Sequence, residues 1–192
     1  MGREFELKYA ATIGAQAAIR AKFGVFRKIA MDTTYFDTPD GVLSAQKMTL
    51  RLRKENDATI CTLKTPLPDG SRGEWECQTT DITAGVQEVV RLGAPAKLLA
   101  LAESGLIVAC GARFTRLAAE IPTADGTAEL ALDNGVLMGG GKEIPLCEVE
   151  IELKTGSDTA AKAVADAIAT EFGLQEEPRS KFHRASQLAK GE

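Results

Sequence analysis

The sequence is nearly free of histidine, since His183 is the only one among 192 residues. A histidine-rich metal site is therefore excluded, and any metal must be bound through oxygen ligands, which Mg²⁺, Mn²⁺ and Ca²⁺ prefer. CxxC pairs are also missing, which argues against a zinc knuckle or a thioredoxin-type site. The cysteines lie in apolar, strand-like stretches, and we interpret them as small buried side chains in a reducing compartment. They are Cys61, Cys77, Cys110 and Cys147.

Two further absences concern the partners of the protein. The most apolar stretch, residues 98–112, contains Glu103 and is too short to span a bilayer, and the charged N-terminus has no apolar signal core. The net charge of −4 argues against a general nucleic-acid coat but leaves room for a local basic pocket. We therefore expect a cytoplasmic protein without membrane or nucleic-acid partners. Its assembly is left open, with a homodimer as one option.

Hydrophobic periodicity and turn residues predict many strands with a few helices among them. No repeat, low-complexity tract or linker is visible, so residues 1–192 are expected to form a single domain. The pattern predicts an α+β fold whose antiparallel sheet is either closed into a barrel or strongly curved. Strands are expected at about 3–11, 31–43 (ending in a turn), 48–55, 59–66, 74–80, 113–122, 127–135 and 145–154, and helices at 14–24, 84–104 (broken by Gly93 and Pro95), 157–173 and 178–189.

The predicted strands share an unusual arrangement of charge. Charged and apolar side chains alternate, which puts the charges on one face of each strand. For a single strand, a solvated outer face is the ordinary explanation. Here six strands repeat the pattern, and the charges are segregated into acidic and basic strands. The charged positions are Glu4, Glu6 and Lys8; Arg51 and Arg53; Lys64; Glu74 and Glu76; Glu129 and Asp133; and Glu148, Glu150, Glu152 and Lys154.

An inverted sheet explains this segregation. Its charged faces would line a central cavity, and its apolar faces would point outward under the helices. Buried charges are tolerated only when they are paired or coordinated. Acidic clusters could hold divalent cations, and arginine and lysine side chains could bind phosphate oxygens. Together, the two kinds of strand predict a site for a metal and a polyphosphate.

The segment EFELK, residues 4–8, resembles the ExExK signature of the CYTH superfamily, the triphosphate tunnel metalloenzymes. Further segments are similar to that family in the same order, over roughly the whole chain. The resemblance is greatest to the bacterial inorganic triphosphatase branch, and it implies a closed antiparallel β-barrel of about eight strands, with a charged tunnel inside and helices outside. The further segments are YFDTPDGVL, MTLRLRKE, TLK, GEWE, RFTR, ALDNG, CEVEIELK and SKFHRA.

The resemblance also implies roles for individual residues. Acids of the first strand and of the late strand match the metal ligands of the family. Lys8, Asp133 and Glu150 are expected to act in catalysis, with Asp133 positioning a second metal or a water. The metal ligands would be Glu4, Glu6, Glu148 and Glu150, and the phosphates would be held by Lys8, Arg51, Arg53, Lys64, Arg113, Arg116 and Lys181.

Several residues keep a structural alternative. Arg72 follows a turn and is interpreted as a solvated loop charge. Glu152 and Lys154 approach the end of their strand, which leaves a place outside the tunnel open, and Glu129 fits the rim equally well. Trp75 is expected to face outward under a helix rather than to stack on a base.

The expected reaction is metal-dependent hydrolysis of a terminal phosphate, with Mg²⁺ or Mn²⁺ as cofactor and inorganic tripolyphosphate as the first choice of substrate. Thiamine triphosphate and nucleoside triphosphates share the part that the motif would recognise. Class IV adenylyl cyclase chemistry, which converts ATP into cAMP, is the alternative reaction in the same tunnel. A polyphosphate-binding module without catalysis is a further alternative, but a simple anion binder has no need of four carboxylates.

Overall fold

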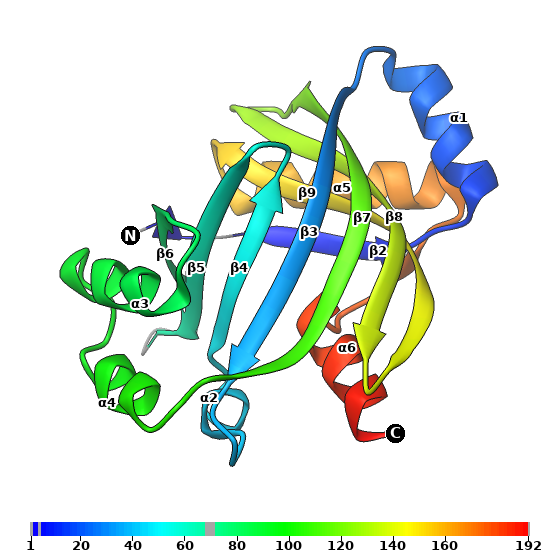
Figure 1. Cartoon of the computed structure of the whole chain (residues 1–192). Helices are drawn as coiled ribbons and strands as arrows, with labels where there is room; N and C mark the ends of the chain where they lie inside the picture. Colours follow the sequence, from blue (N-terminus) through cyan, green and yellow to red (C-terminus); the bar gives the residue numbers. More distant parts are fainter. Residues whose placement is uncertain (1, 4, 68–71, 192) are drawn as a thin grey trace.

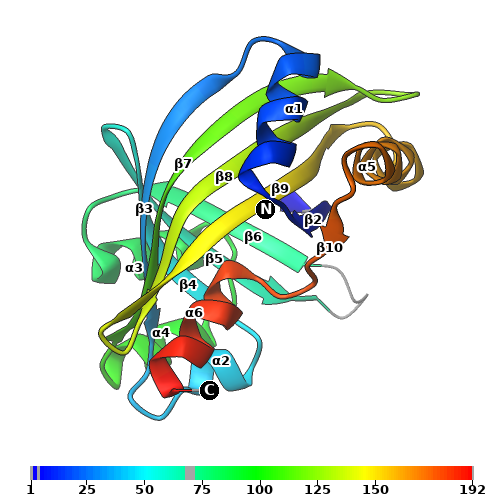
Figure 2. The same ribbon diagram turned by 90° about the vertical axis from the view of Figure 1, so that its right-hand side faces the viewer.

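The computed structural model of the protein describes residues 2–3, 5–67 and 72–191. In these ranges the chain forms a large antiparallel sheet and six helices (Figures 1 and 2). The described part contains no helix long and apolar enough to cross a membrane. The strands are β1 (Gly2–Arg3), β2 (Glu6–Ala10), β3 (Arg27–Asp37), β4 (Thr49–Glu55), β5 (Ala58–Pro66), β6 (Arg72–Gln78), β7 (Ile107–Pro122), β8 (Thr127–Gly139), β9 (Lys142–Thr155) and β10 (Gln175–Glu176). The helices are α1 (Ile13–Phe23), α2 (Val42–Ala45), α3 (Ile82–Arg91), α4 (Lys97–Glu103), α5 (Asp158–Phe172) and α6 (Lys181–Lys190).

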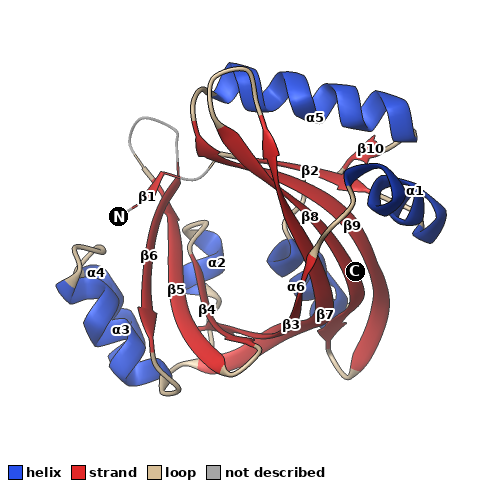
Figure 3. Cartoon of the chain, turned by 90° about the horizontal axis from the view of Figure 1, so that it is seen from above, coloured by secondary structure: helices blue, strands red, loops and turns tan. Residues whose placement is uncertain are grey.

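The sheet curves strongly, as the view from above shows (Figure 3). Its order is β1-β6-β5-β4-β3-β7-β8-β9-β2-β10, and neighbouring strands are antiparallel. These observations confirm the predicted α+β class and antiparallel sheet. Although β1 and β2 are consecutive in the chain, β1 pairs with β6 and β2 pairs with β9, at opposite ends of the sheet. Among the described residues no hydrogen bonds close the sheet, so the closed barrel stays a prediction.

The apolar faces of the strands point outward and are covered by helices. Leu132 of β8 and Val149 of β9 are buried in one core cluster with Ile19 of α1 and Ile168 of α5. Trp75 of β6 lies in a second cluster with side chains of α3 and α4, which confirms its predicted place under a helix. Because side chains alternate along a strand, the charged neighbours of these apolar residues point to the concave side.

Helix α6 is placed differently, because it packs against the concave face, on β7 and β8, near the C-terminal end of β8. Phe182 and Ala185 join a core cluster with Tyr35 and Phe114, and the rings of Tyr35 and Phe182 have centroids 5.2 Å apart. At Gly139 of β8 a Cβ atom would lie 2.3 Å from the carbonyl oxygen of Ala185, so only glycine permits this approach. The docking of α6 brings its first residues to the interior of the curved sheet.

The segment YFDTPD has a clear structural role at the end of β3. Asp37 is buried, and its carboxylate accepts hydrogen bonds from the backbone N–H groups of Thr38 (2.8 Å), Leu43 (2.8 Å) and Ser44 (3.1 Å). Gly41 takes a left-handed conformation with φ of 70° just before α2. The motif therefore fixes the turn that joins β3 to β4, and it places β4 beside β3.

Most of the predicted elements are present with shifted ends. The helical region at 84–104 is divided into α3 and α4 around Gly93 and Pro95, as expected. Strand β7 begins at Ile107 rather than at about residue 113, because residues 107 and 108 continue to pair with Asp37 and Phe36 at the end of β3. The start of β7 therefore follows from its pairing with β3. The sequence around residues 107–112 is apolar without a clear alternation, so it did not indicate this start.

Gly85 provides a test of the packing under α3. A Cβ atom there would lie 2.6 Å from Sγ and 2.7 Å from Cβ of Cys61. Gly85→Ala is expected to lower the free energy of unfolding by about 1–3 kcal/mol in chemical denaturation, although alanine favours helices. The matched control is Gly14→Ala in α1, where the nearest atom is 3.8 Å away and a gain of about 0.5–1 kcal/mol is expected. Equal effects of the two substitutions would contradict this account.

Candidate functional site

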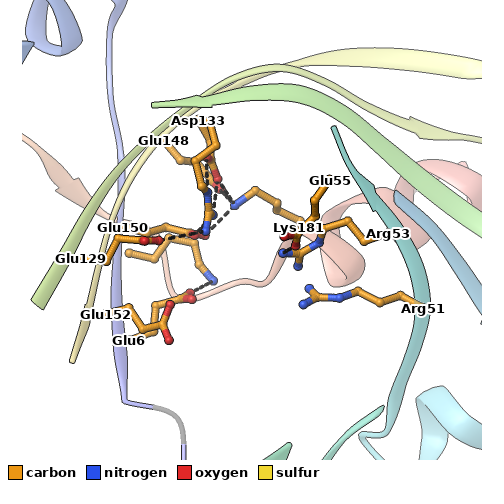
Figure 4. A network of polar contacts seen from close by, with 12 residues as sticks. Glu6, Arg51, Arg53, Glu55, Glu129, Asp133, Glu148, Glu150, Glu152 and Lys181 are labelled. Atoms are coloured by element: carbon orange, nitrogen blue, oxygen red, sulfur yellow. Dashed lines mark hydrogen bonds and ion pairs between the residues drawn. The ribbon is translucent and has the colours of Figure 1, made fainter. Parts of the chain in front are cut away.

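A cavity of about 500 Å³ lies on the concave side of the sheet. Acidic side chains from β2, β8 and β9 face the arginines of β4 across it (Figure 4). The charged strand faces therefore line a cavity, as the inverted arrangement predicts. The charged lining residues are Glu6, Lys8, Arg27, Arg51, Arg53, Glu55, Lys64, Arg72, Glu74, Glu76, Arg116, Glu129, Glu150, Glu152, Lys154 and Lys181.

The basic wall of the cavity consists of Arg51 and Arg53 on β4, Lys64 on β5 and Arg72 on β6. Arg51 and Arg53 are two residues apart and so point to the same face. The Nε atoms of Arg51, Arg53 and Arg72 are buried and have no hydrogen-bond partner in the described ranges. Burial lowers the pKa of Arg53, and the positive charges of Arg51 and Arg116 lower it further. Arg53 therefore carries a charge that its surroundings compensate only in part, and an anion near it would improve that compensation.

Two glutamates of β6 support the basic wall. Glu74 Oε1 lies 3.3 Å from Lys64 Nζ and 3.9 Å from Arg51 Nη2, while Glu76 Oε1 lies 4.0 Å from Arg51 Nη2. Thr62 Oγ1 donates a hydrogen bond of 2.8 Å to Glu76. These acids lie on the neighbouring strand β6 and orient the cations of β4 and β5. The acidic strand whose role the sequence left uncertain therefore supports the basic wall.

The outer acidic row consists of Glu6 on β2, Glu152 on β9 and Glu129 on β8. Glu152 is the register partner of both Glu6 and Glu129, and all three line the cavity. Lys8 Nζ lies 3.5 Å from Glu6 Oε1, and Lys154 Nζ lies 2.8 Å from Glu152 Oε1. The alternative that placed Glu152 and Lys154 outside is therefore wrong, and Glu129 belongs to the cavity. The alternation that turns Glu148 and Glu150 toward the concave side also turns Glu152 to that side.

The inner acidic cluster consists of Asp133, Glu148 and Glu150. Oxygens of the three carboxylates lie within 4.8 Å of one another, and all three residues are buried. Asp133 and Glu148 are 0% exposed and lie behind the cavity lining rather than in it. Lys181 Nζ is 2.8 Å from Asp133 Oδ2, 2.6 Å from Glu148 Oε2 and 2.5 Å from Glu150 Oε1 (Figure 4). The lysine predicted to bind phosphate is thus surrounded by carboxylates.

Two arginines complete the neutralisation of the inner acidic cluster. Arg116 donates forked hydrogen bonds of 2.8 and 2.7 Å to Asp133, and it also contacts Glu150. Arg184 of α6 contacts Glu148. Arg184 was not among the predicted site residues, although its position three residues after Lys181 puts both side chains on one face of α6. The three acids and the three cations (Arg116, Lys181 and Arg184) balance one another.

The pKa values in this cluster follow from burial and from the neighbouring charges. Burial raises the pKa of Glu148 against the opposing effects of Lys181 and Arg184. Burial would also raise the pKa of Glu150, but Lys181 and Arg116 outweigh it and hold that pKa well below its ordinary value. Burial would lower the pKa of Lys181, but the surrounding carboxylates raise it. Lys181 therefore stays charged at neutral pH and acts as an internal counter-ion.

The structure divides the remaining predicted site residues into three groups. Lys8, Arg51, Arg53, Lys64, Arg116 and Lys181 all reach the cavity, and so does Arg72, which therefore is more than a solvated loop charge. Glu4 lies outside the described residues. Arg113 is 61% exposed and pairs with Glu143 at 3.3 Å, away from the cavity. Its predicted phosphate contact does not fit this position, because Arg113 and Arg116 are three residues apart on a strand and face opposite sides.

The donor atoms of the site suit a hard divalent cation. Mg²⁺ and Mn²⁺ prefer carboxylate oxygens, and both acidic groups supply them. In the inner acidic cluster the carboxylates are already balanced by Arg116, Lys181 and Arg184. The outer acidic row faces the cavity, where a bound ion could also contact a phosphate. Glu150 belongs to the inner acidic cluster but also lines the cavity, as the outer acidic row does, whereas Glu148 is fully buried behind it. The outer acidic row and Glu150 therefore fit a metal better than Glu148 does.

Comparisons with known proteins agree with this architecture. The CYTH domain family matches residues 2–186. The inorganic triphosphatase of Haemophilus influenzae is 31% identical over 166 residues, which cover 82% of this chain and 47% of that protein. The chain thus spans about half the length of the curated relative that it matches.

Two solved structures share the fold. HpAC1 from Hippeastrum, described as a candidate adenylyl cyclase with a dominant triphosphatase activity, has a TM-score of 0.69 at 21% identity, over 98% of this chain and 96% of its own. A candidate adenylate cyclase from Bacillus halodurans has a TM-score of 0.66 at 22% identity, over 94% of this chain and 96% of its own. Identities this low support the fold alone. Since the family match covers nearly the whole chain, and the fold and the charged cavity accord with the resemblance, the chain belongs to the CYTH domain family.

Proposed function

We propose that the chain hydrolyses the terminal phosphoanhydride bond of a triphosphate, with inorganic tripolyphosphate as the main substrate and Mg²⁺ or Mn²⁺ as cofactor. One observation carries the proposal: a cavity of about 500 Å³ sets buried arginines with unpartnered Nε atoms against a row of glutamates. A polyphosphate supplies negative charge to the arginines, and its metal ion suits the glutamates. The activity of the Haemophilus influenzae relative supports the same choice.

The basic wall would bind and orient the substrate. Arg51 and Arg53 present forked donors that match phosphate oxygens, and Lys64 and Arg72 extend the same wall. Lys8, whose register partner is Glu150, would contact a phosphate on the acidic side. Catalysis then rests on position and electrostatics, because preorganised cations stabilise charge that develops on the transferred phosphoryl oxygens.

The outer acidic row and Glu150 would hold the divalent cation, with Glu4 as a further ligand predicted from the sequence. Such an ion, when bound, supplies charge neutralisation at the phosphates and an activated water. Asp133 would act indirectly, because its carboxylate is fully buried and holds Arg116 through two hydrogen bonds. Glu148 would likewise position Lys181 rather than touch the metal.

The chemical step balances with water alone. The oxygen of a water attacks the terminal phosphorus of tripolyphosphate, the bridging P–O bond breaks, and the products are pyrophosphate and phosphate.

The site would act as a tunnel closed by the N-terminal segment. The pairing of β1 with β6 and of β2 with β9 supports that form.

Metal removal tests the proposal. Phosphate release from tripolyphosphate with Mg²⁺ or Mn²⁺ is expected to fall by more than about 100-fold in excess EDTA and to return when metal is added back, since a metal contributes several kcal/mol to such transition states. Release that is unchanged in EDTA would contradict the metal requirement. No release from any triphosphate would contradict the hydrolase.

The same assay should include ATP and thiamine triphosphate, because these substrates carry the same triphosphate. Formation of cAMP and pyrophosphate from ATP would favour the cyclase instead. Phosphate release that is fastest from thiamine triphosphate would change the proposed substrate but not the reaction. Tight binding of tripolyphosphate without turnover would favour a binding module.

A further inference from the structure

Gln16 links helix α1 to the backbone directly behind the inner acidic cluster. Its side chain is buried, and its Nε2 atom donates hydrogen bonds to the carbonyl oxygens of Asp133 (3.0 Å) and Glu148 (2.9 Å). These two residues are far from Gln16 in the chain. One amide group thus bridges two strands, β8 and β9, from a helix on the outer face of the sheet.

The two bridged residues form a register pair, since Asp133 of β8 lies opposite Glu148 of β9. On the other side of β9, Ala11 N–H donates to the carbonyl of Cys147 at 3.0 Å, so the backbone groups of Glu148 point toward β8. Gln16 therefore binds the paired backbone carbonyls of β8 and β9 from the outer side of the sheet. The side chains of Asp133 and Glu148 point the other way, into the cluster, and are 0% exposed.

The pair held by Gln16 controls two cations that reach the cavity. Asp133 holds Arg116 through forked hydrogen bonds, and both Asp133 and Glu148 contact Lys181. Arg116 and Lys181 line the cavity. A shift of the backbone pair would therefore move both cations, while the basic wall on β4 to β6 would stay in place.

We infer that Gln16 is a positioning residue for the proposed triphosphate hydrolysis. It acts through the backbone of Asp133 and Glu148, and it fixes the places of Arg116 and Lys181 without touching the substrate. Ile19 of the same helix is fully buried in the core and anchors α1 through apolar contacts, separately from the two hydrogen bonds of the amide. This role rests on the proposed function, since it concerns the same cavity.

Gln16→Met tests the role, because methionine keeps the length of the side chain and removes both hydrogen bonds. We expect kcat for tripolyphosphate to fall about tenfold, the usual scale for a residue that supports a site from behind. KM should stay within about twofold, because the basic wall still binds the substrate. The matched control is Ile19→Val, which loosens the packing of α1 and should leave kcat within about twofold.

Hydrogen exchange at the backbone amides of residues 133 and 148 gives a second measurement that needs no substrate. Exchange at both is expected to be faster in Gln16→Met than in Ile19→Val. If Gln16→Met does not fold, Gln16→Asn, whose amide is too short to bridge both carbonyls, should show the same separation of kcat from KM.

The outcomes separate the two proposals. An active wild type with unchanged kcat in Gln16→Met would overturn the role of Gln16 alone. Equal losses of kcat in Gln16→Met and Ile19→Val would assign the effect to the packing of α1 and overturn that role as well. A wild type that releases no phosphate from any triphosphate would overturn the proposed function and, with it, the role of Gln16.

Discussion

Arg53→Ala is expected to lower kcat/KM for tripolyphosphate by about 10²- to 10³-fold, which is the loss found when one preorganised charge-stabilising group is removed. The Arg53 side chain is 14% exposed and forms an ion pair with Glu55 at 3.2 Å, while its Nε atom has no partner among the described residues. Burial and the nearby positive charges lower its pKa, so the folded protein holds a charge that is not fully compensated. A bound phosphate would supply the missing compensation.

The free energy of unfolding of Arg53→Ala distinguishes a lost phosphate contact from a folding defect. A lowered pKa means that folding disfavours the charged form of Arg53, so removing this charge should not lower the free energy of unfolding, while activity is lost. Arg53→Lys should be intermediate, because a lysine keeps the charge but lacks the fork. Steady-state kinetics with tripolyphosphate and denaturation of the same samples measure both quantities.

Arg113→Ala is the matched control for Arg53→Ala. Arg113 is also an arginine of the sheet, but it is 61% exposed and pairs with Glu143 on the outer face. Exposed ion pairs contribute little, so kcat/KM should change less than about twofold. A loss at Arg113 as large as that at Arg53 would contradict the division of the sheet into a charged face that lines the cavity and an outer face that points away from it.

Alternation along the strands located most of the candidate site from the sequence. A period of two fixes which side chains share a face, and this placed Arg51 with Arg53 and Glu148 with Glu150 correctly on one face each. The same rule, applied strictly, separates Arg113 from Arg116 and adds Glu152. Arg113 was included because a family position was used without the alternation, and Glu152 was left open because it lies near the end of its strand.

The depth of the site could not be predicted in the same way. Whether an acid lines the cavity or lies behind it depends on strand register and on the docking of α6. Asp133 and Glu148 are opposite each other and are covered by Lys181 and Arg184, which come from a distant helix. The close approach of α6 at Gly139 is a tertiary contact that no local pattern indicates.

Lys181→Met is expected to lower the free energy of unfolding by about 3–5 kcal/mol, the usual cost of breaking a buried ion pair. The Lys181 side chain is 8% exposed, and its Nζ atom lies 2.5–2.8 Å from oxygens of all three acids of the inner acidic cluster. Without it, three adjacent carboxylates keep Arg116 and Arg184 as their directly contacting cations. Urea denaturation at pH 8 measures the loss, and Lys190→Met in the exposed last turn of α6 should stay within about 0.5 kcal/mol.

The dependence of this loss on pH distinguishes charge from packing. In the wild type the pKa of Glu150 is held well below its ordinary value of 4.5, so its stabilising effect is present above that value and is lost as the pH falls toward the folded pKa. In Lys181→Met the crowded acids should instead have raised pKa values in the folded state, so lowering the pH relieves their repulsion. The stability gap between the two proteins should therefore narrow as the pH falls from about 8 to about 5.5. A gap that does not change over this range would show that Lys181 stabilises the fold by packing rather than as the counter-ion of the inner acidic cluster.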